Sequence, residues 1–179
     1  MIKKNSVLPL QIIPCNVEEA NTVSDVAIRS YKDFYLHLWY DNGDWYINHS
    51  FSQPVLEKEI KDPNHAFFLI KEKENPIGFL KLNINLPLKG YKQYNCIELE
   101  RIYLINSATG KGYGRQAMDF CFDYAKRLRK EIIWLKAMDT SDAVVFYEGL
   151  GFERCGSLSL DYSQMKEEFR GMVVLLKRL

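Results

Sequence analysis

The chain has 179 residues, with 24 Lys and Arg side chains against 23 Asp and Glu, and a net charge of +1. This length suits one domain with a single sizeable core, and the charge balance argues against a nucleic-acid binder driven by overall positive charge. No apolar run approaches the ~20 residues of a membrane span, and no signal peptide follows Met1–Asn5, so we expect a cytoplasmic protein that does not use a membrane. The four cysteines are widely spaced, show no metal-ligand pattern and are expected to be reduced.

The first half of the chain is expected to contain strands, helices and one hairpin. Short apolar runs indicate the strands, and apolar residues three or four positions apart indicate the helices. The dipeptide Asn42-Gly43 signals a turn within an aromatic stretch, which we therefore expect to be a loop. The expected elements are a strand at residues 8–13, a helix at 17–39, a loop at 40–51, a short helix at 52–61 and hairpin strands at 65–73 and 77–84.

The second half alternates strands and helices. The run at residues 132–135 is continuously apolar, which is typical of a strand covered on both faces. The whole order predicts an α/β fold, a mixed central β-sheet flanked by helices on both faces, in a single domain over residues 1–179. The expected elements are a loop at 86–95, a strand at 97–105, a helix at 112–130, a strand at 132–135, a helix at 141–150 and strands at 152–160 and 172–176.

Three alternate glycines, Gly110, Gly112 and Gly114, lie between a predicted strand and a predicted helix. The N–H groups at the start of a helix have no internal partner, and the helix dipole favours an anion there. Glycine has no Cβ, so the backbone can approach the oxygens of such an anion closely. The three glycines therefore predict a phosphate cradle.

Two well-known phosphate motifs do not fit these glycines. A P-loop requires GxxxxGK followed by Ser or Thr, and the chain has no such run. A dinucleotide fingerprint requires GxGxxG, but Arg115 stands where the third glycine belongs, and Glu131, the acid ~20 residues on, begins a strand instead of ending one. The alternative that the glycines serve only a tight turn stays open.

Two segments together resemble the GNAT N-acetyltransferase superfamily. The first, Thr109–Gly114, is similar to the family pattern R/Q-x-x-G-x-G/A that follows a strand. The second, Ala143–Phe152, contains the Phe-Tyr-x-x-x-Gly-Phe core of a later family segment, at the family's usual distance from the glycines. The resemblance implies a GNAT-like acyl-CoA N-acyltransferase fold and an enzyme that uses acetyl-CoA and no metal.

The same resemblance assigns parts of the chain to acetyl-CoA. Backbone amides of one strand are implied to hold the pantetheine arm and the thioester oxygen, namely those of Ile102, Tyr103 and Leu104. The residues implied at the pyrophosphate are Thr109, Gly110, Lys111, Gly112, Tyr113, Gly114 and Arg115. Thr109 departs from the usual Arg or Gln, and Thr140 stands where many members carry an Asn that contacts the cofactor. A hydroxyl can replace part of that hydrogen bonding.

The strand before the glycines carries two candidate catalytic carboxylates, Glu98 and Glu100. Strict alternation places both on one face, together with Ile102 and Leu104. Two glutamates on an internal strand are costly unless they are solvated, paired or used, so pairing with a nearby arginine or lysine is the structural alternative. The resemblance implies that either one takes the proton of the attacking amine and that Tyr147, otherwise a core aromatic, is the acid at the leaving sulfur.

The acceptor site is expected among the N-terminal helices and residues 40–51. Asp41, Asp44 and Trp45 lie there, and carboxylates beside aromatic rings can hold an alkylammonium ion. The segment Glu98–Leu104 also resembles bacterial polyamine N-acetyltransferases, which favours a small cationic amine such as a polyamine. A protein or peptide acceptor, and a catalytically silent CoA-binding regulatory module, remain open alternatives. So does a homodimer, since many relatives dimerise.

Overall fold

The structure, a computed structural model, describes residues 10–179. The predicted first strand begins at residues 8 and 9, which lie outside the described residues; the strand itself covers Gln11–Pro14. The helices are α1 Ala20–Phe34, α2 Asp44–Phe51, α3 Gln53–Lys61, α4 Tyr113–Arg127 and α5 Ala143–Gly149. The strands are β1 Gln11–Pro14, β2 His65–Glu72, β3 Asn75–Asn83, β4 Cys96–Leu104, β5 Ile132–Met138, β6 Glu153–Ser159 and β7 Gly171–Arg178.

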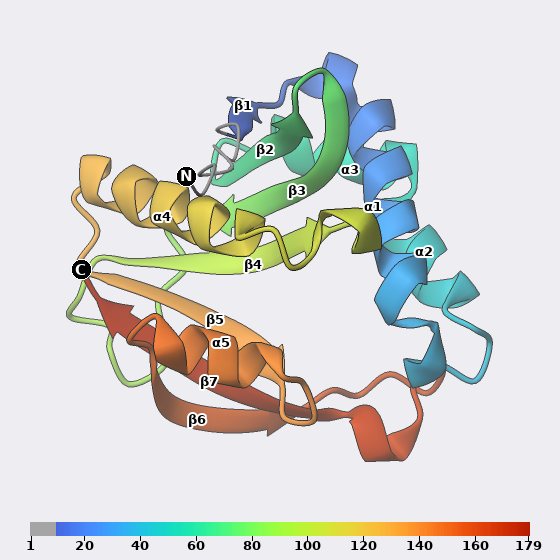
Figure 1. Cartoon of the computed structure of the whole chain (residues 1–179). Coiled ribbons are helices and arrows are strands. Elements are labelled where there is room, and N and C mark those ends of the chain that lie inside the picture. Colours follow the sequence, from blue (N-terminus) through green and yellow to red (C-terminus); the bar gives the residue numbers. More distant parts are fainter. Residues whose placement is uncertain (1–9) are drawn as a thin grey trace, which may run out of the picture.

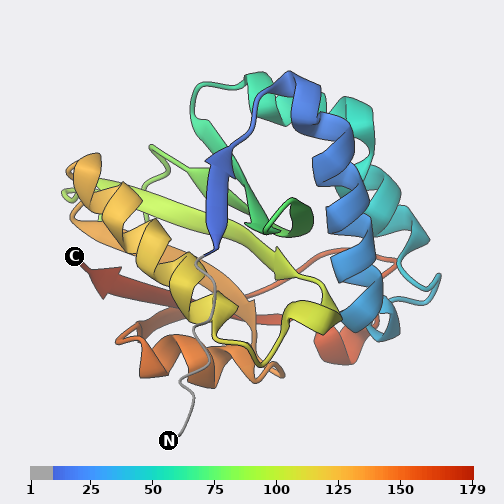
Figure 2. The same cartoon turned by 45° about the horizontal axis from the view of Figure 1, so that its top comes forward.

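All seven strands form one mixed sheet in the order β1-β2-β3-β4-β5-β7-β6. The pair β4 and β5 is parallel and the other neighbours are antiparallel. Helices α4 and α5 cover one face of this sheet, and α1, α2 and α3 gather on the other (Figures 1 and 2). The predicted fold class is therefore confirmed, and the order of strands and helices is as expected except for the additional helix α2. Between residues 10 and 179, no helix has the length and apolar character that crossing a membrane requires.

The prediction of a loop over residues 40–51 was wrong for most of that segment. Asn42 and Gly43 do form a turn, both with positive φ (55° and 84°). The chain then enters α2, whose first N–H groups are capped by Asp41, which accepts from the N–H of Gly43 (3.0 Å) and of Trp45 (2.8 Å). The helix forms despite its weakly helical aromatic residues because Ile47 and Phe51 are buried in the core.

Strand β4 contains a bulge at Glu100. In its register with β3, Leu99 pairs with Leu82 and Arg101 with Lys81, so Glu100 has no partner on β3. The extra residue shifts the alternation of side chains by one position. Glu98 therefore shares its face of the sheet with Arg101 and Tyr103. Ile102 and Leu104 lie on the other face, and their predicted placement beside the glutamates was wrong.

Strands β4 and β5 separate beyond the bulge. They pair over Cys96–Leu99 and Ile132–Leu135, although β4 continues to Leu104 and β5 to Met138. Figure 1 shows the two strands diverging from each other, with α4 above β4 and α5 in front of β5. The backbone groups on the β5 side of residues 100–104 are thereby left without a strand partner. This split positions the site described next.

Candidate active site

A cavity of about 290 Å³ occupies the space between the diverging ends of β4 and β5. Residues 99–103 of β4 form one wall and residues 135–138 of β5 form another. The other walls come from segments far apart in the chain, including α1, α2, α5 and the connection between β6 and β7. Of the predicted catalytic and cofactor residues, the cavity brings four together in its lining: Glu100, Ile102, Tyr103 and Tyr147.

The glycine segment has the geometry that an anion cradle requires. Gly110 (φ 72°) and Gly112 (φ 79°) adopt the left-handed conformation, and no other atom lies within 4 Å of where a Cβ would stand on either. Gly112 caps α4, which begins at Tyr113. Within residues 10–179, no backbone N–H of Gly110–Arg115 donates to a protein acceptor. Six unpartnered donors at a helix start fit a pyrophosphate group.

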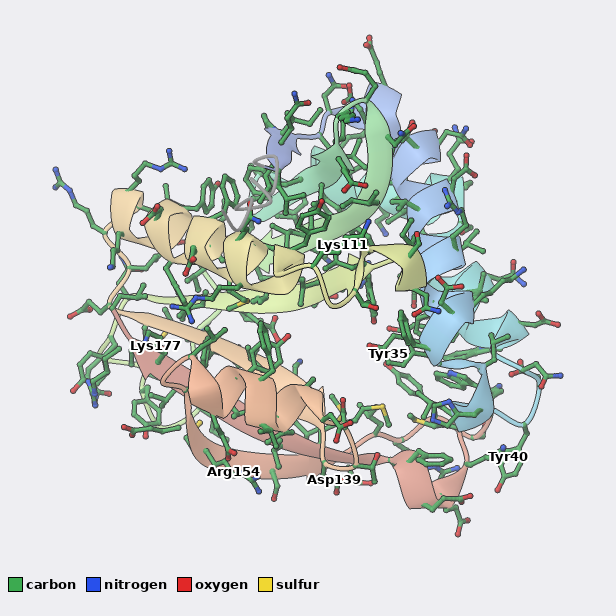
Figure 3. All side chains as sticks on the ribbon, in the orientation of Figure 1. Tyr35, Tyr40, Lys111, Asp139, Arg154 and Lys177 are labelled. Carbon is green, nitrogen blue, oxygen red and sulfur yellow. The ribbon has the colours of Figure 1, made fainter. Side chains whose placement is uncertain are left out.

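The side chains around this cradle are partly engaged with one another. Lys111, which Figure 3 labels close to the start of α4, lies 3.6 Å from a carboxylate oxygen of Glu72. The Tyr113 hydroxyl donates to the same carboxylate, and this hydrogen bond lowers the pKa of Glu72. Arg115 pairs with Asp119 on the helix surface at 3.2 Å. The cradle thus offers its anion mainly backbone donors, with exposed cations close by.

The two residues that depart from the family pattern are both exposed. The Thr109 hydroxyl donates to the carbonyl oxygen of Asn106 at 2.8 Å and so serves the turn that leads into the glycines. Thr140 lies in the connection between β5 and α5 and is not among the cavity-lining residues.

The two glutamates of β4 have different surroundings. Glu98 has a side chain only 1% exposed, pairs with Lys136 at 2.9 Å and does not line the cavity. The Glu100 side chain is 25% exposed and lines it. The side-chain amide of Asn83 links the two, since its Nδ2 donates to Glu98 at 2.6 Å and to Glu100 at 2.8 Å. Of the two candidate carboxylates, Glu100 is therefore the one that can reach a bound acceptor.

The charge of Glu100 is stabilised by its neighbours. Burial acts to raise the pKa of this carboxyl, but the positive charges of Arg101 and Lys81 outweigh it. Lys81 and Asn83 also donate hydrogen bonds to it. The pKa of Glu100 is consequently below its ordinary value, and the group is ionised at neutral pH.

Tyr147 is buried in the lining of the same cavity, 8% exposed. Its ring packs against Phe152 and Phe146, with centroids 5.7 and 5.3 Å away. Burial, reinforced by Tyr35 and Cys121, raises the pKa of Tyr147 above that of an ordinary tyrosine. In the described part of the chain no group hydrogen-bonds to its hydroxyl, so a neutral O–H donor faces the cavity.

The predicted acceptor residues lie beside the cavity and outside its lining. Asp41 caps α2, as described above, and Asp44 is exposed in the first turn of that helix. Trp45 stacks on His49 (centroids 4.8 Å, planes 9° apart) and lies 5.3 Å from the ring of Tyr162.

Most of the aromatic lining was not predicted as part of a site. Tyr31, Tyr35, Trp39 and Tyr162 all face the cavity, and Trp39 Nε1 donates to the Tyr31 hydroxyl at 2.8 Å. Figure 3 labels Tyr35 beside the split, at the end of α1. One signal was available: residues 31, 35 and 39 are spaced by four, which places aromatics on one side of a helix. No pattern in the sequence connects them to Tyr162.

Comparison with known proteins gives a family and several similar proteins. The acetyltransferase (GNAT) family matches residues 25–152. An uncharacterized N-acetyltransferase of Lactobacillus delbrueckii subsp. lactis is 27% identical over 110 residues, which are 61% of this chain and 64% of that protein. The match thus spans less than two thirds of this relative. An uncharacterized N-acetyltransferase of Methanocaldococcus jannaschii is 24% identical over 171 residues, which are 92% of this chain and 70% of that protein.

Solved structures show the same fold. The PaiA N-acetyltransferase of Thermoplasma acidophilum, in complex with coenzyme A, has a TM-score of 0.75 at 21% identity, covering 96% of this chain and 100% of that one. A mutant of the spermidine N-acetyltransferase SpeG of Vibrio cholerae has a TM-score of 0.67 at 19% identity, covering 94% of this chain and 93% of that one. At these identities the likeness speaks for the fold alone.

Proposed function

Because the chain belongs to the acetyltransferase (GNAT) family, whose donor is acetyl-CoA, we propose that it acetylates the primary amine of a small cationic acceptor such as a polyamine. The observation that carries the proposal is the cavity in the strand split, because Glu100 and Tyr147 both line it. A carboxylate held ionised and a tyrosine held neutral are the base and acid that direct acyl transfer to an amine requires.

The residues present fit the donor. The unpartnered N–H groups of Gly110–Arg115 would bind the pyrophosphate, and the free backbone edge of Ile102–Leu104 would bind the pantetheine arm. Bound acetyl-CoA supplies an activated acetyl thioester. The β4 backbone N–H groups in the split can donate to its oxygen as negative charge develops there. Thr109 and Thr140, both exposed, would add side-chain contacts at the two ends of this site.

Glu100 has two tasks in this proposal. Alkylamines are protonated at neutral pH, so an ionised Glu100 attracts the ammonium ion and takes its proton, directly or through water. Because its pKa is lowered by Arg101 and Lys81, Glu100 then passes the proton to solvent readily. Glu98 is paired with Lys136 and is joined to Glu100 through Asn83, so it stabilises these neighbouring charged and polar groups without lining the cavity itself.

Tyr147 supplies the proton at the other end of the reaction. Its Oη carries a hydrogen throughout the neutral pH range, since burial raises its pKa. The hydroxyl can donate to the departing sulfur, which lowers the barrier for loss of the thiol.

A cationic acceptor suits the remaining walls. Tyr31, Trp39, Tyr46 and Tyr162 present aromatic rings to the cavity, and such rings attract ammonium groups over their faces. Asp41 and Asp44, near Trp45 at the start of α2, add negative charge beside the cavity and would draw cations towards it. These features support an alkylammonium ligand over a neutral or anionic one.

The direct test is acceptor-dependent release of free thiol from acetyl-CoA. The panel contains spermidine, a simple monoamine, an aminoglycoside and peptides with a free N-terminus or a free lysine. We expect turnover with the small amines and an acetylated product by mass spectrometry. Turnover with peptides alone would contradict the small-amine assignment. Binding of acetyl-CoA without turnover of any acceptor would indicate a silent binding module.

A further inference from the structure

Four charged side chains meet between α3, β3 and β4. Lys81 lies 3.0 Å from Glu59 and 2.7 Å from Glu100. Arg101 lies 2.9 Å from Glu59 and 3.3 Å from Glu100. Each cation thus contacts both anions, and we call this set of four the buried quartet. The side chains are 3% exposed for Lys81, 10% for Arg101, 21% for Glu59 and 25% for Glu100.

The sheet register makes the quartet necessary. Lys81 and Arg101 are paired directly across β3 and β4, and like charges in that position repel. The bulge brings one carboxylate, Glu100, to the same side, and α3 brings the second, Glu59, from above the sheet. Two anions and two cations make the quartet neutral. Removing any one member leaves an uncompensated buried charge.

The members of the quartet differ in their relation to the cavity. Glu100 and Arg101 line it, whereas Glu59 and Lys81 do not. Within residues 10–179, the other charged side chain in the cavity lining is Lys136, and its charge is cancelled by Glu98, with which it pairs at 2.9 Å. Tyr46 of α2, close to Glu100 and Arg101, is neutral because burial raises its pKa. Glu59 is therefore the group that keeps Lys81 and Arg101 from giving this wall a net positive charge.

We propose that Glu59 is a positioning residue that sets the charge preference of the acceptor site without touching the acceptor. By neutralising Lys81 and Arg101, it leaves the carboxylate of Glu100 free to attract an ammonium ion. Without Glu59 the same carboxylate faces two cations, and the wall carries one excess positive charge. This inference rests on the proposed acetylation of a cationic amine, and it adds a residue from a helix that carries no family motif.

The test compares Glu59→Gln, Lys81→Met and the double variant, which have quartet charges of +1, −1 and 0. Glu57→Gln is the matched control, since Glu57 lies on the same helix and contacts Gln53 at 2.9 Å instead of the quartet. KM and kcat are measured for spermidine, for a monoamine and for acetyl-CoA. Melting temperatures report whether each variant is folded.

We expect Glu59→Gln to raise KM for spermidine by about tenfold, as one charge a few ångströms from the site does at protein dielectric values. The rise should be smaller for the monoamine and below about twofold for acetyl-CoA. Glu59→Asp and the double variant should recover most of the loss, and Glu57→Gln should match the wild type. If Glu59→Gln is too unstable to assay, the double variant is compared with Lys81→Met, and its KM for spermidine should be the higher of the two.

Several outcomes would overturn the inference. An unchanged KM for spermidine in an active Glu59→Gln enzyme contradicts it and leaves the proposed function intact. Equal rises for spermidine, monoamine and acetyl-CoA would mean that Glu59 is merely structural. A wild-type enzyme that acetylates none of the amines removes the proposed function, and this inference with it.

Discussion

The parallel pairing of β4 with β5 ends at Leu99 and Leu135. The next residue of β4 is the bulged Glu100, so loss of pairing and exposure of the carboxylate occur at the same point of the strand. The bulge thus turns Glu100 towards the cavity, and the split frees the backbone that would bind the pantetheine arm.

A first prediction concerns backbone protection by the donor. Saturating acetyl-CoA should slow hydrogen exchange in residues 100–104 and 110–115, because it gives partners to the N–H groups on the β5 side of the first segment and to those of the glycine segment. Residues 132–135 of β5 are the internal control, since they are already paired on both sides, with β4 and with β7. Mass spectrometry of peptic peptides measures the effect. Equal slowing in all three segments would point to general stabilisation instead.

A second prediction compares the two left-handed glycines, Gly110 and Gly112, with Gly114. Gly110→Ala and Gly112→Ala force a Cβ into a left-handed conformation and should each cost about 1 kcal/mol of stability. They should also weaken acetyl-CoA binding, which calorimetric titration measures. Gly114→Ala is the control, because Gly114 lacks a positive φ and its Cβ would only touch Phe146 at 3.6 Å. A weaker donor affinity in Gly114→Ala than in the other two would contradict the cradle.

A third prediction distinguishes the roles of Glu98 and Glu100 by their effects on activity and stability. Glu100→Gln should lower kcat/KM for the amine by about a hundredfold, the low end of the range for loss of a general base. Glu98→Gln should cost less activity but more stability, since it leaves Lys136 unpaired beside a buried amide. Because the pKa of Glu100 is lowered, its ionised form persists as the pH falls through the ordinary glutamate range, so its protonation should not limit activity above about pH 5. Steady-state rates from about pH 5 to 9 check this.

A fourth prediction tests the acid. Tyr147→Phe should lower kcat about a hundredfold with little change in the KM for acetyl-CoA. Burial raises the pKa of Tyr147, so its proton is lost only at a pH above the ordinary tyrosine value of about 10. The wild-type rate should therefore show no fall due to this group below about pH 9.5. Tyr124→Phe, on α4 and outside the cavity lining, is the control. A Tyr147→Phe enzyme that keeps the kcat of the wild type would refute the role.

A fifth prediction concerns the aromatic wall. Tyr162→Ala removes a ring that packs on Trp39, Trp45 and Tyr46, and it should raise the acceptor KM several-fold while leaving the acetyl-CoA KM unchanged. Tyr40→Ala is a matched control, because Tyr40 is 65% exposed and outside the cavity lining. Equal effects of the two substitutions on the acceptor KM would remove Tyr162 from the site.

The donor side of the site could be predicted from sequence because local rules determine it. The glycines between strand and helix, and the Phe146-Tyr147 segment, are short motifs whose meaning depends on near neighbours in the chain. The bulge at Glu100 could not be predicted, since it arises from the register with β3 and leaves no sign in β4 itself. The two glutamates lie before and at the bulge, and their predicted placement on one face was correct. Ile102 and Leu104 follow the bulge, and they were therefore predicted on the wrong face.

The acceptor side depends on contacts between distant segments. Asp41 and Trp45 were predicted as acceptor residues from their charged and aromatic surroundings. The helix α2 forms there because its apolar side packs on α1 and because Phe51 packs on Phe79 of β3. Tyr162 reaches the cavity through the fold of the connection between β6 and β7. Glu59 carries no motif, and its importance follows from two cations that only the folded sheet places opposite each other.

The connection between β6 and β7 is fastened to the turn after α1 by two backbone hydrogen bonds. The N–H of Tyr40 donates to Gln164 at 3.0 Å, and the N–H of Lys166 donates to Leu38 at 2.9 Å. During synthesis this contact cannot form until residues 164–166 have left the ribosome, whereas the hairpin and the glycine segment are complete earlier. The growing polypeptide should therefore acquire the glycine segment proposed to bind the nucleotide first, and the wall proposed to bind the amine only when the C-terminal strand docks.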